Sequence, residues 1–536
     1  MITLIIVLAF LGVAAVSLLL VRRGLGQRLA ERLDDLSARC VSLCGSAPEG
    51  VDASTPLSLR AQCAYLQWTL PRQRESWKVW LFRTARAEVS LLESELDELA
   101  AGLDPLRGAG GVSLRGFRSP VDGGETVYSL RVPEGYDPAA RWPLIVHLHG
   151  RGRLAPYQGH RAPDYGGDVL VVAPYGKGSA DFMGPAEADV LAAIDEVRRL
   201  YSVDEDRVYL AGASMGGTGS WHLAAHYPDR FAALVAASGN SDDRVWEELW
   251  EGRPAEPAEG SVAAALKRLE RLDSPVTYAG NLLNVPCRAI HGADDDIVPV
   301  EHARNMVAAL EQAGAQVEYH ELVGVGHGVG FGRVREKQAA WLLTHRRAKR
   351  PARVRYATDG RWPGAYWIRR LEPARPLALA EVDARLSSPG EVEISTRDCL
   401  SLEVDLAPLA GGAAGGVKVS IDGQALGSFD GERAAFLHDG GQWRRVEALP
   451  ARVPREIYRV FDAPFAIVFG TGGTDAKLCE ALRREAERLA SEWRRRYFAS
   501  PRLCPDAEAA DEVLGNCGLI LFGGPAENSV TRRALA

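Results

Sequence analysis

The fold is decided by one stretch, Val208-Tyr209-Leu210-Ala211-Gly212-Ala213-Ser214-Met215-Gly216. An apolar run that ends in Gly-x-Ser-x-Gly, followed by a helix-like pattern, predicts a strand, a sharp turn and a helix, with Ser214 at the turn. Glycines lack a Cβ atom, so they allow the strand and the helix to approach closely while the serine hydroxyl stays exposed. The stretch therefore predicts a nucleophilic serine at the carboxyl edge of a parallel sheet.

Two later segments can supply the groups that activate such a serine. A serine hydroxyl needs a histidine to take its proton and a carboxylate to orient that histidine. The loop 291–299 contains the run Asp294-Asp295-Asp296 and follows the strand-like residues 287–290, and the glycine-flanked His327 follows the alternating run 316–322. Both segments lie past the carboxyl end of a predicted strand, where open α/β sheets gather their catalytic groups. The order Ser, Asp, His along the chain is the order of the α/β-hydrolases.

A pair of backbone N–H groups must also face the negative oxygen that forms during acyl transfer. The residue after the nucleophile supplies one of them, and here that residue is Met215. The other comes from the loop after an earlier core strand, and the buried-strand run 144–148 ends in His149-Gly150-Arg151-Gly152. We assign the second N–H to Arg151, with Gly150 as the alternative.

Residues 109–345 resemble an α/β-hydrolase domain of the branch that holds polyhydroxybutyrate-depolymerase-like esterases, feruloyl and acetyl-xylan esterases, and the catalytic domain of prolyl oligopeptidases. In that family the carboxylate loop reads H-G-x-x-D-x-x-V-P, and counting from His291 makes Asp295 the catalytic carboxylate. The resemblance covers under half of the chain and implies ester or amide hydrolysis. The stretches that carry it are 132–136, His149-Gly150, 204–217, 291–299 and Gly326-His327.

These residues lead us to expect a serine hydrolase that cleaves small carboxylic esters through an acyl-serine intermediate. One alternative is a prolyl-oligopeptidase-like peptidase that acts on short peptides. Relatives of that type screen peptides with a β-propeller, whereas the segment before this hydrolase reads as helices, which favours esters. The other alternative is a catalytically silent hydrolase fold that binds glycan or envelope partners through a β module.

The composition argues against several other function classes. The 536 residues carry a net charge of only −7, and the basic residues alternate with acidic ones, so no nucleic-acid partner is expected. The eight cysteines form no C-x-x-C pair, and three adjacent aspartates are too few ligands for a hard cation. The loop 470–475 ends in Asp475 where a dinucleotide motif needs glycine. We therefore expect no metal and no cofactor, and we expect His222 and His226 to be core or surface positions.

The first residues predict a membrane anchor. Residues 2–21 are uncharged and almost wholly apolar, and a helix of this length spans about 30 Å, the thickness of a bilayer core. We assign residues 1–23 to a single-pass anchor and 24–108 to amphipathic helices. The arginines that follow the anchor favour a cytoplasmic location for the rest of the chain, whereas the resemblance to exported hydrolases favours the other side.

Two further regions follow the hydrolase. Short alternating runs with glycine turns over 352–450 predict an antiparallel β-sandwich-like domain. Its aromatic residues Tyr366, Trp367 and Trp443 are expected mainly in the core, with glycan contact as the alternative. Residues 451–536 return to an α/β pattern, with a strand at 464–469, a long helix at 476–497 and a strand near 519–522. Two strands are too few for a separate sheet. We therefore expect either that these strands pair with another part of the molecule or that the chain is a shortened version of a longer relative.

Overall fold

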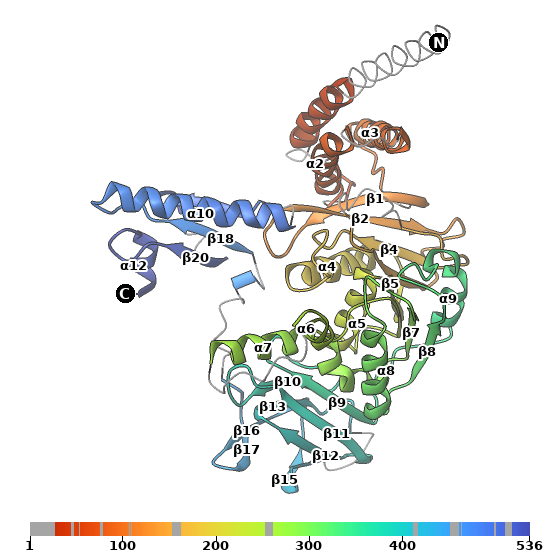
Figure 1. Ribbon diagram of the computed structural model, residues 1–536, viewed down its shortest axis with the longest axis vertical. Helices are drawn as coiled ribbons and strands as arrows, with labels where there is room; N and C mark the ends of the chain where they lie inside the picture. Colours follow the sequence, from red (N-terminus) through yellow and green to blue (C-terminus); the bar gives the residue numbers. More distant parts are fainter. Residues whose placement is uncertain are drawn as a thin grey trace.

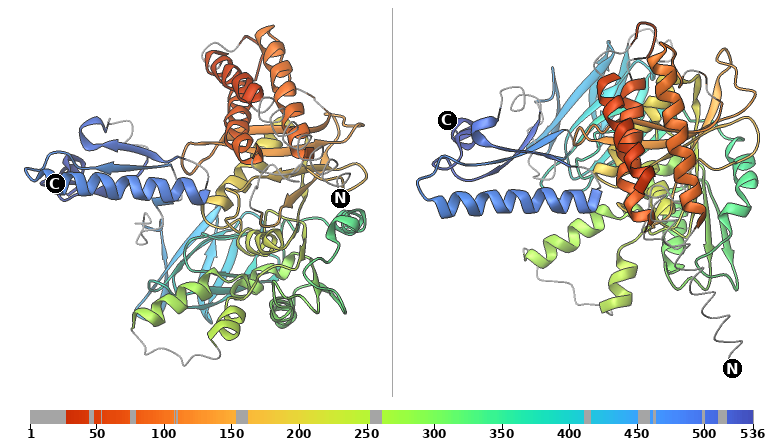
Figure 2. Two further views of the ribbon diagram at one scale, coloured as in Figure 1. Left: turned by 45° about the horizontal axis from the view of Figure 1, so that its top comes forward. Right: turned by 90° about the horizontal axis from the view of Figure 1, so that it is seen from above.

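The computed structural model of the protein describes residues 27–43, 48–52, 54–74, 79–106, 108, 110–152, 162–251, 261–410, 416–450, 460–461, 464–497, 500–509 and 517–535. Figure 1 shows a central α/β domain with helices above it, a β-sheet module below it and a small C-terminal α/β unit at its side. The two turned views show the same arrangement (Figure 2).

The central domain is built on one eight-stranded sheet with the order β1-β2-β4-β3-β5-β6-β7-β8. Strand β2 pairs antiparallel with both β1 and β4, and the remaining neighbours, from β4 through β3 to β8, pair in parallel. This topology confirms the predicted α/β-hydrolase-like fold. The strands are β1 (Gly111–Arg118), β2 (Glu125–Val132), β3 (Trp142–Leu148), β4 (Leu170–Pro174), β5 (Val203–Ala213), β6 (Ala233–Ala237), β7 (Cys287–Gly292) and β8 (Val317–Leu322).

Helices cover both faces of this sheet because alternate strand residues point to opposite sides. Leu144, Val146 and Leu148 of β3 belong to one buried cluster, with α4 (Pro185–Leu200), α5 (Met215–His226) and α8 (Glu301–Ala313). Ile145, between them, belongs to a second cluster with α9 (Arg335–Leu342) on the other face. Between β6 and β7 lie α6 (Arg244–Glu251) and α7 (Val262–Asp273).

The N-terminal helices pack on the β1–β2 hairpin. They comprise residues 27–43, α2 (Thr55–Arg74) and α3 (Val79–Ala100). A Cβ on Gly116 of β1 would lie 2.3 Å from the Cβ of Ala61, so glycine allows α2 to lie directly on the strand. Leu92, Leu96 and Leu99 of α3 are fully buried in this layer.

No helix among the residues described from position 27 onward is long and apolar enough to cross a membrane. The anchor predicted over residues 2–21 lies outside the described residues and stays a prediction.

Residues 353–446 form two sheets with strand orders β10-β13-β16-β17 and β15-β14-β12-β11-β9. One pairing departs from the antiparallel prediction, because β12 and β14 run parallel. Residues 364–367 form a turn before β10, with Tyr366 at a φ of 56°, where the sequence suggested a strand. The strands are β9 (Arg353–Thr358), β10 (Ile368–Pro373), β11 (Ala380–Ser388), β12 (Glu391–Arg397), β13 (Cys399–Asp405), β14 (Val417–Ile421), β15 (Gln424–Phe429), β16 (Arg433–Asp439) and β17 (Gln442–Val446).

The aromatic rings of this module are buried. Tyr366, Trp367 and Trp443 are 8%, 1% and 3% exposed. Such rings stabilise the core between the two sheets, and the contact of this module with glycans stays a prediction.

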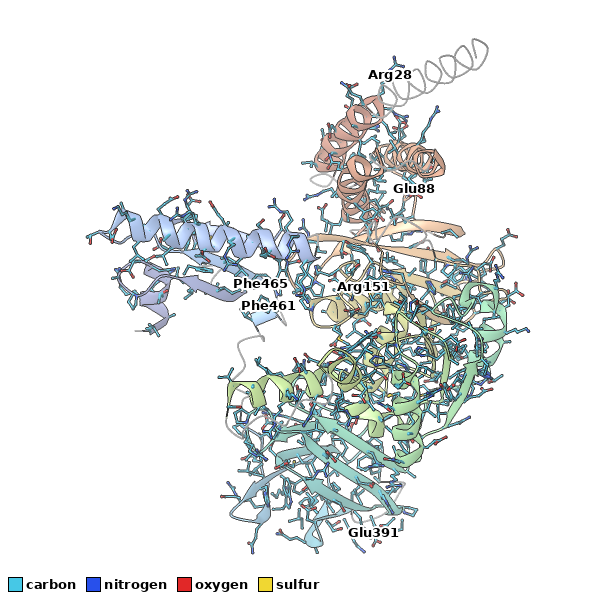
Figure 3. The ribbon with its side chains drawn as sticks, viewed as in Figure 1. Arg28, Glu88, Arg151, Glu391, Phe461 and Phe465 are labelled. Carbon is cyan, nitrogen blue, oxygen red and sulfur yellow. The ribbon has the colours of Figure 1, made fainter. Side chains whose placement is uncertain are left out.

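The C-terminal unit has a three-stranded parallel sheet of its own, with the order β19-β18-β20. The strand that the sequence analysis missed, β19 (Arg502–Pro505), lies beside β18 (Phe465–Phe469), with β20 (Gly518–Phe522) on the other side. The described strands therefore pair with one another rather than with another region. In α10 (Ala476–Tyr497), the ring nitrogen of Trp493 donates to Asp122 Oδ2 at 3.1 Å and so joins the unit to the central domain. Figure 3 shows Phe461 and Phe465 at this unit.

One buried carboxyl group in the helical layer makes stability depend on pH. Glu95 of α3 is 6% exposed, and burial raises its pKa from 4.5 to about 7. A raised folded-state pKa contributes stability that is present below about pH 4.5 and is lost as the pH rises through about 7. We expect Glu95→Gln to raise the free energy of unfolding at pH 8 by up to about 3 kcal/mol, and so to unfold at a higher temperature than the parent. At pH 4.5 the gain should be small.

Thermal unfolding of both proteins at pH 4.5, 6 and 8 measures this difference. The exposed Glu311→Gln on α8 is the matched control and should follow the parent at each pH. Equal pH dependence of Glu95→Gln and the parent would contradict the assignment.

Candidate active site

Ser214 lies at the turn between β5 and α5. Its backbone has a φ of 57° and a ψ of −125°, a conformation that residues with a side chain rarely adopt. The N–H of Ser214 donates to the carbonyl of Ala237 at 2.8 Å, which ties the turn to the end of β6. A strained residue at such a position persists only when the surrounding structure holds it.

The glycines around Ser214 are required by direct backbone contact. A Cβ on Gly216 would lie 1.9 Å from the carbonyl oxygen of Leu148, and a Cβ on Gly212 would lie 2.3 Å from the carbonyl oxygen of Gly216. Both distances are far below any van der Waals contact. The first turn of α5 can therefore reach the ends of β3 and β5 only if these positions carry no side chain.

The structure brings Ser214, Asp295 and His327 together from three separate segments. His327 Nε2 lies 2.9 Å from Ser214 Oγ, and His327 Nδ1 lies 2.8 and 3.0 Å from the two carboxylate oxygens of Asp295. The Asp295 side chain is fully buried, whereas that of His327 is 25% exposed. The three side chains thus form a continuous hydrogen-bonded row that ends at the partly exposed hydroxyl.

The structure separates Asp295 from its two acidic neighbours. Asp294 and Asp296 are exposed, whereas Asp295 Oδ1 accepts the N–H groups of Ile297 at 3.0 Å and Val298 at 2.9 Å. Burial alone would raise the pKa of Asp295, but these N–H groups and His327 outweigh it and hold the pKa below its usual value. Asp295 is therefore an ionised carboxylate that faces the histidine.

His291 is a neighbour of Asp295 to which the sequence analysis gave no role beyond its place in the motif. Its Nε2 donates to the carbonyl of Val298 at 2.9 Å and lies 3.3 Å from Asp295 Oδ2. A Cβ on the next residue, Gly292, would lie 2.2 Å from the carbonyl oxygen of Val325. His291 therefore holds the carboxylate loop through its bond to Val298, and the absence of a side chain at Gly292 leaves room for the loop that carries His327.

The predicted oxyanion loop lies beside the nucleophile. Leu148 of β3 pairs with Gly212 of β5, so the residues just past both strands meet at one edge. A Cβ on Gly150 would lie 3.8 Å from Ser214 Cβ. The Arg151 guanidinium binds both carboxylate oxygens of Asp181 at 2.7 Å, and Figure 3 shows this arginine in the central domain. Met215, Gly150 and Arg151 thus lie at the Ser214 turn, and their role as N–H donors stays a prediction.

The loop 175–184 packs against the predicted oxyanion loop, His149-Gly150-Arg151-Gly152. The ring nitrogens of His149 lie 2.9 and 3.1 Å from the carbonyl oxygens of Gly150 and Tyr175. The His149 ring also packs edge-on against the buried Phe182. The loop is anchored by Lys177, whose Nζ donates to Asp122 Oδ2 at 2.8 Å in a fully buried pair. Nothing in the local sequence pattern indicates these contacts, because they join residues far apart in the chain.

Comparison with known proteins identifies the domain. Residues 183–345 match the model of the prolyl oligopeptidase family, and this range contains Ser214, Asp295 and His327. Dipeptidyl-peptidase 5 of Porphyromonas gingivalis is 26% identical over 233 residues, which cover 37% of this chain and 32% of the relative. Feruloyl esterase C of Emericella nidulans is 32% identical over 124 residues, which cover 21% of this chain and 46% of the relative.

Residues 183–345 thus match a serine hydrolase family, and esterases and peptidases are both among the relatives. An uncharacterized secreted protein of Arthroderma benhamiae matches a longer part of the chain, with 25% identity over 315 residues, or 55% of the chain and 31% of the relative. The chain therefore spans about a third of the length of this relative and of the Porphyromonas peptidase.

The geometry around Asp295 predicts how the activity of the protein responds to changes in the acidic loop 294–296. In Asp295→Asn the amide cannot orient His327 in the required tautomer, so we expect kcat for an activated ester to fall by about 10⁴. The exposed Asp296→Asn removes the same charge from the same loop and should keep near-parental kcat. Steady-state kinetics of both variants, with circular dichroism to verify folding, tests this expectation. Similar losses in the two variants would contradict it.

Proposed function

We propose that the protein hydrolyses carboxylic esters through a covalent acyl-serine intermediate. One observation carries the proposal, namely the hydrogen-bonded row from Ser214 Oγ through His327 to the buried Asp295. A hydroxyl is reactive at neutral pH when a positioned base removes its proton as it attacks. This row supplies both the base and the group that orients it.

In the proposed reaction, Ser214 Oγ attacks the ester carbonyl carbon while His327 Nε2 takes the hydroxyl proton. Asp295 stabilises the imidazolium that results, and the N–H groups of Met215 and Arg151, or of Gly150, hold the negative oxygen. His327 then protonates the leaving alcohol, and the acyl group stays on Ser214. Water, activated by His327, attacks the acyl-serine and releases the acid.

Two observations favour esters over peptides as substrates. The feruloyl esterase relative has a higher identity than the dipeptidyl-peptidase relative, although over a shorter stretch. Among the described residues, the segment before the hydrolase consists of helices that pack on β1 and β2, with no strands of a β-propeller to screen peptides. A prolyl-oligopeptidase-like peptidase is the second candidate, because the family match and the peptidase relative support it.

Covalent labelling tests whether Ser214 is the nucleophile. We expect a fluorophosphonate probe to label the parent protein, because the probe reacts with a serine that a histidine activates. Ser214→Ala should show no labelling, while Ser241→Ala, a buried serine whose hydroxyl donates to the carbonyl of His302, should keep it. In-gel fluorescence measures the outcome. An unlabelled but folded parent protein would support a catalytically silent fold instead.

A substrate series tests the preference for esters. We expect p-nitrophenyl esters of short acyl chains to be turned over with a kcat/KM at least about 100-fold above that of aminoacyl and dipeptidyl p-nitroanilides, because the difference in leaving group alone favours the ester. A second comparison uses feruloyl methyl ester and feruloyl amide, which share one acyl group and lack the activated nitrophenyl and nitroanilide leaving groups. Faster turnover of the amides or of the peptide substrates would favour the peptidase.

A further inference from the structure

A buried group of three metal-binding residue types lies at the other end of the nucleophile helix. Glu187 stands in the first turn of α4, and His222 and His226 stand one turn apart on α5. Their side chains are almost fully buried, with 9%, 2% and 1% of each residue exposed. One nitrogen or carboxylate oxygen from each residue lies within 4.8 Å of the others. The three groups therefore converge on one small volume of the interior.

His226 is buried without a partner for its polar atoms. Neither ring nitrogen makes a hydrogen bond of normal geometry, although the residue is 1% exposed. A buried polar group that lacks a partner costs about 1–3 kcal/mol. The indole of Trp362 stacks on the imidazole with ring centroids 3.4 Å apart, and such stacking covers a face of the ring. The lone pair of an imidazole nitrogen lies in the ring plane and stays available to a ligand.

Glu187 is held so that one oxygen faces the histidines. Tyr227 and Trp362 donate hydrogen bonds to Oε1, at 3.0 Å for Trp362, while Oε2 lies 2.6 Å from His222 Nε2. Burial would raise the pKa of Glu187, but the bonds from His222, Tyr227 and Trp362 outweigh it and lower the pKa. Hydrogen bonds to the outer oxygen are the usual support of a carboxylate that binds a metal through the other oxygen.

We propose that Glu187, His222 and His226 bind a zinc ion. Two histidines at positions i and i+4 of a helix face the same side, and together with one carboxylate they form a ligand set that zinc prefers. Zinc bonds of about 2.0–2.1 Å place tetrahedral ligand atoms about 3.3 Å apart. The three atoms lie within 4.8 Å of one another, and His222 Nε2 and Glu187 Oε2 are 2.6 Å apart, so the proposed ion takes the place of their hydrogen bond and moves these two atoms apart.

The three protein groups leave one tetrahedral position, which a buried water molecule fills in this proposal, and we assign the ion a structural role. The site is closed to solvent, and its surroundings come from two domains, because Trp362 belongs to the β-sheet module and the three ligands belong to the α/β domain. The backbone carbonyl of His226 also accepts a hydrogen bond from Tyr356 of β9 at 3.4 Å. A bound ion fixes the carboxyl end of α5 and the ring that the module inserts beside it.

Metal content and thermal stability test the proposal without reference to catalysis. The full chain is purified without a polyhistidine tag, and zinc is measured by mass spectrometry before and after treatment with a chelator. We expect one zinc ion per chain, and loss of the metal should lower Tm by about 5 °C. Replacement by Co²⁺ should give the visible absorption of a tetrahedral site, a reading that needs no variant.

The variants locate the metal. We expect His226→Gln and Glu187→Gln to purify with at least tenfold less zinc and to lose the Tm response to chelator. His320→Gln replaces an exposed histidine of β8 and should behave as the parent does. Three outcomes would overturn the proposal: a parent protein without zinc whose Tm does not respond to added Zn²⁺, unchanged zinc content in a folded His226→Gln, or zinc loss in His320→Gln.

Discussion

The whole site depends on direct backbone contact around Ser214. A Cβ on Gly216, Gly217 or Gly239 would lie 1.9, 2.5 or 2.4 Å from a neighbouring backbone atom, so α5 begins as close to the strand ends as a polypeptide allows. This contact forces Ser214 into a left-handed backbone conformation that costs about 1–3 kcal/mol. All twelve residues of α5 are buried, and their packing holds the strained turn. Ser214 stays partly exposed because the buried helix that follows it holds the turn in place.

The same helix connects the two largest parts of the protein. Its amino end presents Ser214, and its carboxyl end contacts the β-sheet module. Asn281 bridges that junction, because its amide donates to the carbonyls of Ala225 and Ala357 while its oxygen accepts the N–H of Ala357. The module therefore packs against the end of α5 that is remote from the nucleophile. It stabilises the helix that begins at the Ser214 turn.

Much of the site was predictable because each functional residue follows a short, strongly patterned strand. The local sequence alone predicts three features at the strand ends: Gly-x-Ser-x-Gly at the end of β5, the acidic loop after β7, and the glycine-flanked His327 after β8. The contacts that support them carry no such signal. Lys177 with Asp122, His149 with Phe182, and Glu187 with His222 each join residues from separate elements. The strand β19 was missed because four residues of mixed character, ending in proline, lack a clear alternation.

The sequence by itself determined that this chain contains an α/β domain with a serine, an acidic loop and a histidine in hydrolase order, because those features depend on residue type and spacing along the chain. Only the tertiary structure decided that Asp295 is fully buried between two exposed aspartates, that β12 and β14 run parallel, and that two helix histidines converge on Glu187. These outcomes depend on how elements far apart in the chain pack together. Packing sets burial, distance and charge at each residue, and none of these can be read from local spacing.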